Sequence, residues 1–206
     1  YDQSYDFEHI VLWDGEQSNE SNDNYFSYNY FSDSVIQDLY PKTYHLHFPG
    51  SFVQGSAPGS ALRAVGLMAA RGRYVTFDDS DVWHDDNHIE NLLNAVDGKE
   101  WAFCRRKVWI EDELIGVDNF ESVGDVPERK VPYILVDNNT MIFKRKFGAS
   151  AACLYRETTN YNDDRLMTQF LYQYAGEPGM SNKATINQVC PDKLANMFRE
   201  NCTKIT

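Results

Sequence analysis

The chain has 206 residues, of which 42% are hydrophobic and 24% charged, and we expect one folded domain over residues 1–206 rather than a disordered protein. Its formal net charge of -12 disfavours binding to nucleic acid or to an anionic membrane surface, because the averaged field repels polyanions. The four cysteines include no CxxC pair, which disfavours a structural zinc site. No apolar run approaches roughly 20 residues and no signal-peptide pattern is seen, so we expect no transmembrane segment and a location in the cytoplasm.

The first predicted strand covers residues 7–13, an apolar run that ends in a turn at Asp14 and Gly15. Residues 16–34 are rich in Ser, Asn, Asp and Tyr without periodicity, which predicts a polar surface loop. Alternating polar and apolar side chains predict a second strand at residues 43–48. The chain therefore begins with two strands separated by a long loop.

A helix and a strand then lead to an acidic turn. The amphipathic segment 61–72 predicts a helix that ends at Gly72, and the apolar residues 73–77 predict a buried strand. This strand carries an acidic cluster at its carboxyl end, formed by Asp78, Asp79 and Asp81. A second helix is predicted at residues 87–96.

The alternation of strands and helices predicts an α/β fold with a mostly parallel sheet flanked by helices, in which ligands bind at the carboxyl ends of the strands. Within this domain we distinguish residues 1–97, which carry the acidic turn, from residues 98–206. Antiparallel additions are expected in the second half. The strands predicted there are residues 101–110, 113–117, 133–136 and 140–147, and a last helix is predicted within residues 190–202.

Asp79 and Asp81 flank Ser80 in a DxD arrangement directly after the strand. Two carboxylates on one turn suit Mg²⁺ or Mn²⁺, which bind hard oxygen ligands together with water and substrate phosphates. Such an ion neutralises the charge that develops on a leaving diphosphate. The alternative interpretation of the cluster is a solvated acidic turn that caps the following helix.

Side chains next to the acidic turn offer two further contacts. Trp83 is placed to stack on the apolar face of a sugar, although packing in the core is the commoner use of tryptophan. His84 and His88 have the i, i+4 spacing of a metal-binding pair. Without a third soft ligand nearby, a solvated helix start is the favoured interpretation of the two histidines.

Residues 59–93, GSALRAVGLMAARGRYVTFDDSDVWHDDNHIENLL, resemble the central block of the inverting family 2 glycosyltransferases, whose fold is GT-A. Ala64 stands where the family has Asn. The resemblance implies that Asp79 and Asp81 bind a divalent cation and that Arg63 and Asp79 contact a nucleotide sugar. The matching positions are Arg63, Gly66, Ala70, Gly72, Tyr74, Phe77, Asp79 and Asp81.

Residues 3–16, QSYDFEHIVLWDGE, are similar to the segment of the family that ends in Val-Asp-Asp-Gly-Ser. The resemblance implies that Asp14 accepts a hydrogen bond from the nucleobase. Trp13 replaces the first Asp of the pair and Glu16 replaces the Ser, which leaves the base preference open. Taken alone, Asp14 and Gly15 read as an ordinary turn.

Residues 140–171, TMIFKRKFGASAACLYRETTNYNDDRLMTQFL, resemble the segment where the family has a strand, an Arg-rich turn and Glu-Asp-x-x-Leu on a helix. In the family this Asp is the general base that takes the proton of the acceptor hydroxyl. The spacing to Leu166 favours Asp163 for this role, whereas treating both acids as the Glu-Asp pair favours Asp164. A charge pair at the start of a helix is the alternative interpretation.

The resemblance implies a glycosyltransferase that moves a sugar from a nucleotide-diphosphate sugar, expected to be UDP-linked, to a hydroxyl of a sugar or lipid-linked acceptor, with inversion. It also implies that residues 1–97 are the nucleotide- and metal-binding half and residues 98–206 the acceptor-side half. Two rivals are a nucleotidyltransferase of related fold and a non-catalytic module that binds calcium and carbohydrate. The family normally begins with a strand, a Pro-x-Tyr-Asn turn and a helix before the position of Gln3. We therefore expect the domain to be incomplete at its N-terminus.

Overall fold

The computed structural model describes eight segments, residues 8–14, 43–48, 59–79, 81–119, 124–125, 134–157, 163–190 and 194–204. They divide into two units. The first lies within Tyr74–Lys144 and Asn162–Thr206, and the second within Tyr5–Arg73 and Arg145–Tyr161. Each unit draws on both predicted halves of the chain, and a single domain over 1–206 stays a prediction. The predicted loop 16–34 lies outside the described residues.

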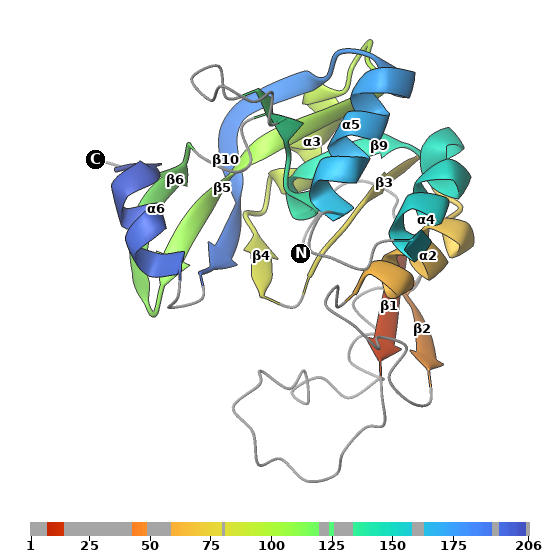
Figure 1. Cartoon of the computed structure of the whole chain (residues 1–206), viewed down its shortest axis with the longest axis horizontal. Helices are drawn as coiled ribbons and strands as arrows, with labels where there is room; N and C mark the ends of the chain where they lie inside the picture. Colours follow the sequence, from red (N-terminus) through yellow and green to blue (C-terminus); the bar gives the residue numbers. More distant parts are fainter. Residues whose placement is uncertain are drawn as a thin grey trace, which may run out of the picture. The chain divides into compact units, whose positions relative to one another are not determined.

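The first unit is built on a seven-stranded sheet with the order β11-β6-β5-β10-β4, in which β9 pairs with both β5 and β3. Figure 1 shows β5 and β10 as the long central strands. A two-stranded sheet of β7 (Gly124–Asp125) and β8 (Ile134–Leu135) belongs to the same unit. The strands of the large sheet are β3 (Tyr74–Thr76), β4 (Val82–His84), β5 (Trp101–Ile110), β6 (Glu113–Asp118), β9 (Met141–Lys144), β10 (Gly179–Val189) and β11 (Cys202–Thr203).

The α/β fold class and the antiparallel additions of the second half are confirmed, but the balance of strand directions differs from the expected mostly parallel sheet. Within the large sheet as described, β5 and β10 are parallel, whereas the remaining pairings are antiparallel. The reason is that β4, β6 and β9 run opposite to β5 and β10, and that β11 and β3 then pair antiparallel with β6 and β9. The second half of the chain therefore dominates this sheet.

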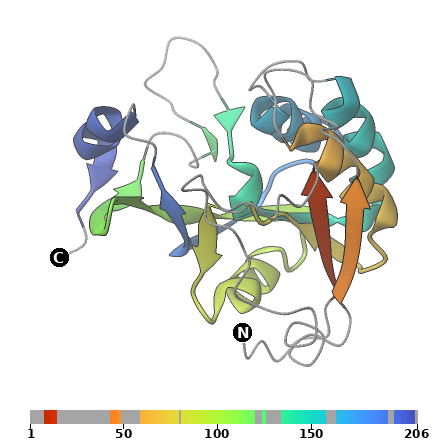
Figure 2. The ribbon, with the colours of Figure 1, turned by 90° about the horizontal axis from the view of Figure 1, so that it is seen from below.

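Helices cover both faces of the sheet. Neighbouring residues of a strand point to opposite faces, and Ala102 packs with Leu92 and Val96 in the cluster beneath α3 (His88–Ala95). Trp101 instead meets Tyr172 of α5 (Asp163–Ala175) edge-on, with ring centroids 5.0 Å apart. Figure 2 views the sheet edge-on, with α3 and α5 on opposite sides. Burial of these apolar side chains is the main stabilising contribution.

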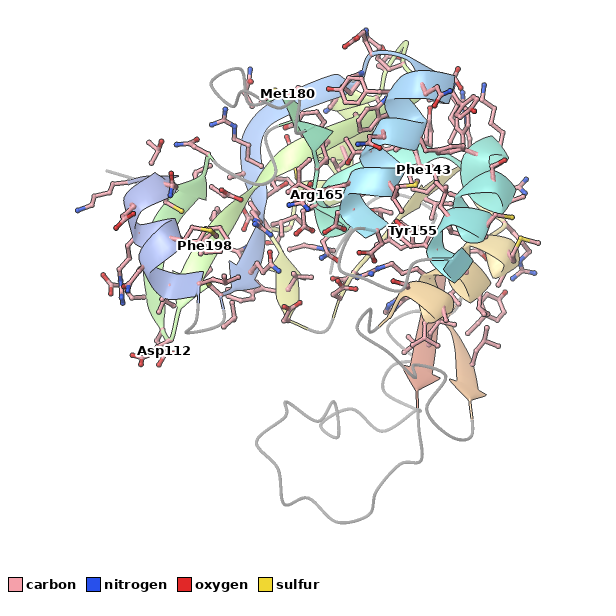
Figure 3. All side chains as sticks on the ribbon, viewed as in Figure 1. Asp112, Phe143, Tyr155, Arg165, Met180 and Phe198 are labelled. Atoms are coloured by element: carbon pink, nitrogen blue, oxygen red, sulfur yellow. The ribbon has the colours of Figure 1, made fainter. Side chains whose placement is uncertain are left out.

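A second apolar cluster holds α6 (Ala195–Asn201) against the end of the sheet. Phe198, labelled in Figure 3, is 4% exposed and packs with Val108 and Ile110 of β5. The helix predicted within residues 190–202 is thus present, and its apolar side faces the strands. Its last residue leads directly into β11, which pairs with β6.

The second unit combines two parallel strands with two helices. β1 (His9–Asp14) pairs in register with β2 (Thr43–Phe48), as the sequence predicts for both strands. Gly66 of α2 (Ser60–Ala69) lets the helix approach β1, because a Cβ there would lie 3.1 Å from the Leu12 side chain. α2 also approaches α4 (Gly148–Glu157), which follows the short helix η2 (Arg145–Phe147).

Two predicted boundaries need correction, and five elements are missed. The helix predicted at 61–72 ends at Ala69, and the strand predicted at 140–147 ends at Lys144, where the chain turns into η2. The sequence patterns do not predict the strands β4, β7, β10 and β11 or the helix α4. No helix in the described segments combines the length and apolarity needed to span a bilayer.

Candidate active site

The acidic turn follows β3 in the first unit and is anchored on both sides. Phe77 packs against Phe143 of β9, which is labelled in Figure 3, with ring centroids 6.0 Å apart. After the turn, the Val82 N–H donates to the Asp79 carbonyl at 3.2 Å, and the Val189 N–H of β10 donates to the Asp81 carbonyl at 3.2 Å. The turn is therefore held between β9 and β10 by contacts that do not involve its carboxylates.

Asn139 holds Asp79 at two points. The Asp79 N–H donates to Asn139 Oδ1 at 2.9 Å, and Asn139 Nδ2 donates to Asp79 Oδ2 at 3.1 Å. Asn139 belongs to the short 3₁₀ helix η1 (Asn138–Thr140), which begins after Asp137 and precedes β9. This amide fixes both the backbone and the side chain of Asp79.

Two carboxylates of the turn have raised pKa values. Loss of water and then repulsion from Asp79 raise the pKa of Asp81 above its usual range. The pKa of Asp78 is raised by the same loss of water and then by Asp79 and Asp81, although 45% of its side chain stays exposed and water offsets part of the rise. Burial and the neighbouring carboxylates thus disfavour the charged forms of Asp78 and Asp81.

The chemistry of this turn fits a divalent cation bound jointly with a ligand. Among the residues that the structure describes, no three His, Cys, Asp or Glu side chains form a complete metal cage. Mg²⁺ and Mn²⁺ are commonly held by one or two carboxylates together with water and substrate phosphates. Asp79 and Asp81, whose charges repel, match such a partial set of ligands.

Asp164 meets the same short segment that holds Asp79. Its Oδ1 accepts a hydrogen bond from the Asn138 N–H at 3.3 Å, one residue before Asn139. Thr168, one turn further along α5, donates to the Asp164 carbonyl at 2.7 Å and accepts from the Val136 N–H at 3.0 Å. The start of α5 is thus tied to the chain on either side of Asp137. Asp163 is the first residue of the same helix and is half-buried.

Trp83 of β4 presents an exposed ring next to the turn. It is 41% exposed, and its ring centroid lies 5.5 Å from that of Trp109. Asn187 belongs to β10, which lies between β4 and β5 in the sheet. Its side chain accepts from Trp109 Nε1 at 3.1 Å and donates to Asp85 at 2.9 Å. Loss of water acts to raise the pKa of Asp85, but hydrogen bonds from Lys107 and Asn187 outweigh it and lower the pKa.

The expectation that His84 and His88 form a solvated helix start is wrong. His84 and His88 stack with ring centroids 4.2 Å apart, and His88 is completely buried. His88 Nδ1 lies 2.8 Å from the Thr185 hydroxyl of β10. Burial and then the neighbouring His84 lower the pKa of His88 to about 3, so this imidazole is neutral and structural. The strand β10, missed by the sequence patterns, is the reason for the burial.

Arg63 and Asp14 belong to the second unit. The guanidinium of Arg63 folds back over the start of α2, where its Nη1 would lie 3.8 Å from a Cβ placed on Gly59. Gly59 has a φ of 87°, a conformation that favours glycine. Asp14 is the last residue of β1, and its side chain lies outside the description. The contacts of both residues with a nucleotide stay predictions.

Sequence reasoning finds the acidic turn and the start of α5 but misses Asn139, which the structure places beside Asp79. In the sequence, DNNT at residues 137–140 reads only as a turn. The structure brings Asp79 and Asp164 to adjacent residues of this segment.

An α/β sheet covered by helices, with an acidic turn directly after one strand, is the arrangement of the GT-A glycosyltransferases. The chain belongs to the family described as Glycosyl transferase family 2, whose profile matches residues 53–157 and so includes the acidic turn. No curated protein matches the sequence.

Solved structures of S. aureus TarS share the fold. TarS 1-349 is 18% identical with a TM-score of 0.58, and the match covers 96% of this chain and 56% of that chain. TarS 1-349 in complex with UDP is 18% identical with a TM-score of 0.60, covering 91% and 53%. The complex with UDP-GlcNAc is 17% identical with a TM-score of 0.57, covering 92% and 52%. This chain therefore spans about half the length of these structures.

Proposed function

We propose that the protein transfers a sugar from a UDP-linked donor to a hydroxyl acceptor, with inversion at the anomeric carbon. The observation that carries the proposal is that η1 contacts Asp79 through Asn139 and Asp164 through Asn138. A carboxylate for the donor phosphates and a carboxylate for the acceptor are thereby supported by adjacent residues. TarS, which shares the fold, has been seen with UDP and with UDP-GlcNAc.

Asp79 and Asp81 are the proposed ligands of Mn²⁺ or Mg²⁺. When bound, the cation would neutralise the negative charge of the diphosphate. Asp79 is held in place for this role by Asn139, and loss of water followed by repulsion from Asp79 raises the pKa of Asp81. Arg63 and Asp14 are proposed to contact the diphosphate and the nucleobase, and Trp83 the sugar.

The proposed chemical step needs a base at the acceptor hydroxyl. Asp163 or Asp164 takes the proton of this hydroxyl while its oxygen attacks the anomeric carbon from the side opposite the phosphate. The bond between the anomeric carbon and the phosphate oxygen breaks, and the nucleoside diphosphate leaves with the electron pair. The hydrogen bond between Asp164 and Asn138 favours Asp164, since it fixes this carboxylate near the segment that holds Asp79.

Thermal melting tests the donor site. UDP should raise the melting temperature when Mn²⁺ or Mg²⁺ is present and not in EDTA, because the cation links the phosphates to the carboxylates. Asp81→Ala should remove this cation-dependent shift. Equal stabilisation by UDP with and without EDTA would contradict the proposed metal role.

Transfer from UDP-sugars tests the base. Asp164→Asn should lower the turnover by about 10²- to 10⁴-fold, the usual contribution of general base catalysis, while cation-dependent UDP binding is kept. Asp163→Asn is the matched variant, one residue away on the same helix turn. If Asp163→Asn shows the large loss and Asp164→Asn does not, the base is Asp163. Release of a sugar phosphate instead of UDP would identify a nucleotidyltransferase.

A further inference from the structure

A buried arginine contacts the two segments that flank the acidic turn, the start of η1 and β10. Arg106 of β5 is 4% exposed, and its Nε donates to Asp118 Oδ2 at 2.8 Å. Its Nη1 donates to Asp137 Oδ2 at 2.6 Å and to Gln188 Oε1 at 2.5 Å. One guanidinium thus meets acceptors from β6, from the start of η1 and from β10. The planar fork of arginine can serve several acceptors in fixed directions, which the single ammonium of lysine cannot.

The first branch from Arg106 leads to Asp79. Asp137 Oδ1 accepts from both the backbone N–H of Asn139 at 2.9 Å and its Nδ2 at 3.1 Å. The amide of Asn139 has one donor end and one acceptor end. With Nδ2 directed toward Asp137, its Oδ1 accepts from the Asp79 N–H and Nδ2 also reaches Asp79 Oδ2. Asp137, which accepts from Arg106 through its other oxygen, therefore sets which way this amide points.

The second branch leads to Asp81. Gln188 Oε1 accepts from Arg106, so its Nε2 is the group left to donate. Gln188 precedes Val189, whose N–H donates to the Asp81 carbonyl at 3.2 Å, and the Gln188 side chain acts to lower the pKa of Asp81. Arg106 therefore orients a second amide, and this one contacts the other carboxylate of the turn. The two amides reach the turn from different elements, η1 and β10.

From this geometry we infer that Arg106 is a positioning residue, which holds Asp79 through Asn139 and Asp81 through Gln188 in the arrangement that binds a divalent cation. The inference rests on the proposed function, because it concerns the same pair of carboxylates. Arg106 acts by fixing the orientation of two amides, and each amide directs N–H groups at one carboxylate.

A purely structural role for Arg106 predicts a different result. Buried ion pairs contribute little net stability relative to apolar side chains of similar size, but removing one partner destabilises the protein. A structural role would lower the melting temperature and leave the cation affinity of the folded protein unchanged. A positioning role lowers the affinity for the cation, by about 10- to 100-fold for residues that orient metal ligands.

The experiment measures Mn²⁺ binding without nucleotide by electron paramagnetic resonance, and UDP binding with and without Mn²⁺ by calorimetry, on the full chain at a temperature where each variant is folded. Arg106→Met should weaken Mn²⁺ binding by about 10- to 100-fold. Arg106→Lys should recover only part of the affinity, because lysine cannot serve both branches.

Gln188→Leu is the second variant, and it leaves Asp118 and Asp137 as acceptors for Arg106. It removes the amide near Asp81 without adding a charge, so it should weaken Mn²⁺ binding even if Arg106→Met does not fold. Leu92→Ala is the matched control, since Leu92 is fully buried in the cluster beneath α3 and is not part of either branch. This control should lower the melting temperature and keep the Mn²⁺ affinity.

Unchanged Mn²⁺ affinity in folded Arg106→Met or in Gln188→Leu would overturn the inference. If the wild-type chain binds Mn²⁺ and the variants lose it, the inference holds even where UDP binding shows no cation dependence, a result that would count against the proposed function alone. Failure of the wild-type chain to bind Mn²⁺ would overturn both.

Discussion

The sheet of the first unit is supported in two contrasting ways. Beneath α3 lies an apolar cluster that includes Leu92, Val96 and Ile186, each nearly or fully buried. Behind the acidic turn lies a polar cluster centred on Arg106, with Asp118 completely buried and Asp137 largely so. Apolar burial stabilises without direction, whereas a buried charge is tolerated only with partners in defined positions. The first cluster therefore holds the sheet together, and the second fixes individual side chains.

The largest effect on stability is expected from unpairing the polar cluster. Asp118→Ala leaves Arg106 without the acceptor of its Nε and should lower the free energy of unfolding by about 3–5 kcal/mol, the usual cost of an uncompensated buried charge. Urea denaturation at pH 7 measures this change. A loss below about 1 kcal/mol, as for surface pairs, would show that water reaches the guanidinium and that the cluster is not buried in solution.

Truncating a side chain of the apolar cluster should lower the free energy of unfolding by a comparable or smaller amount. Leu92→Ala should lower the free energy of unfolding by about 2–5 kcal/mol, through lost burial and the cavity left beneath α3. Chemical denaturation followed by circular dichroism gives the value. Leu92→Met, which keeps most of the volume, should cost less than about 1.5 kcal/mol. Equal losses in both variants would show that the site does not depend on packing.

Because His88 is buried beside the apolar cluster, it makes the stability of the protein depend on pH. Its pKa is lowered to about 3 in the folded protein, whereas an unfolded histidine titrates near its ordinary value of 6.5. As the pH falls below 6.5, the unfolded chain takes up a proton that the folded chain does not, so stability is full above 6.5 and declines toward pH 3. The expected loss is roughly 2 kcal/mol between pH 6.5 and 5.

His88→Gln should flatten this pH dependence, because glutamine does not titrate. Melting temperatures of both proteins at several pH values between 7 and 5 provide the comparison. The variant loses some stability at pH 7, where its side chain replaces the imidazole near Thr185. The same slope in the wild-type chain and in the variant would show that another group takes up the proton.

The smallest effect is expected for an ion pair outside both clusters. Lys144 Nζ lies 2.8 Å from Glu100 Oε1, and both side chains are partly exposed. Lys144→Met should change the free energy of unfolding by less than about 1 kcal/mol, since exposed pairs are screened by water and salt. Denaturation in low and high salt measures it. A loss as large as that of Asp118→Ala would remove the distinction between exposed and buried pairs.

The contrast between the clusters also explains what the sequence predicts. Strand and helix patterns identify β2 and β5 with their full bounds, because apolar periodicity records which side of an element is buried. The sequence does not predict β10, whose residues include Ser181, Asn182 and Lys183 and which becomes a strand through pairing with β5 and β4.

The sequence also predicts only part of the candidate site. Asp79 and Asp81 follow an apolar strand, a pattern visible along the chain, and Asp163 begins a helix as expected. Asn139 contacts Asp79 across 60 positions of sequence, and Gln188 contacts Arg106 across 82. No local pattern encodes such contacts, because an isolated amide reads alike on a surface turn and in a buried network.

The unequal exposure of the tryptophans gives the protein an intrinsic optical signal. Trp101 is completely buried and donates its Nε1–H to the Gly176 carbonyl at 2.7 Å, so its fluorescence should be insensitive to a dissolved quencher such as acrylamide. Trp83 is 41% exposed and stands two residues after Asp81, so its emission should be readily quenched. A sugar nucleotide that settles over this ring would shield it, and the arrival of a donor could then be followed by light without any label.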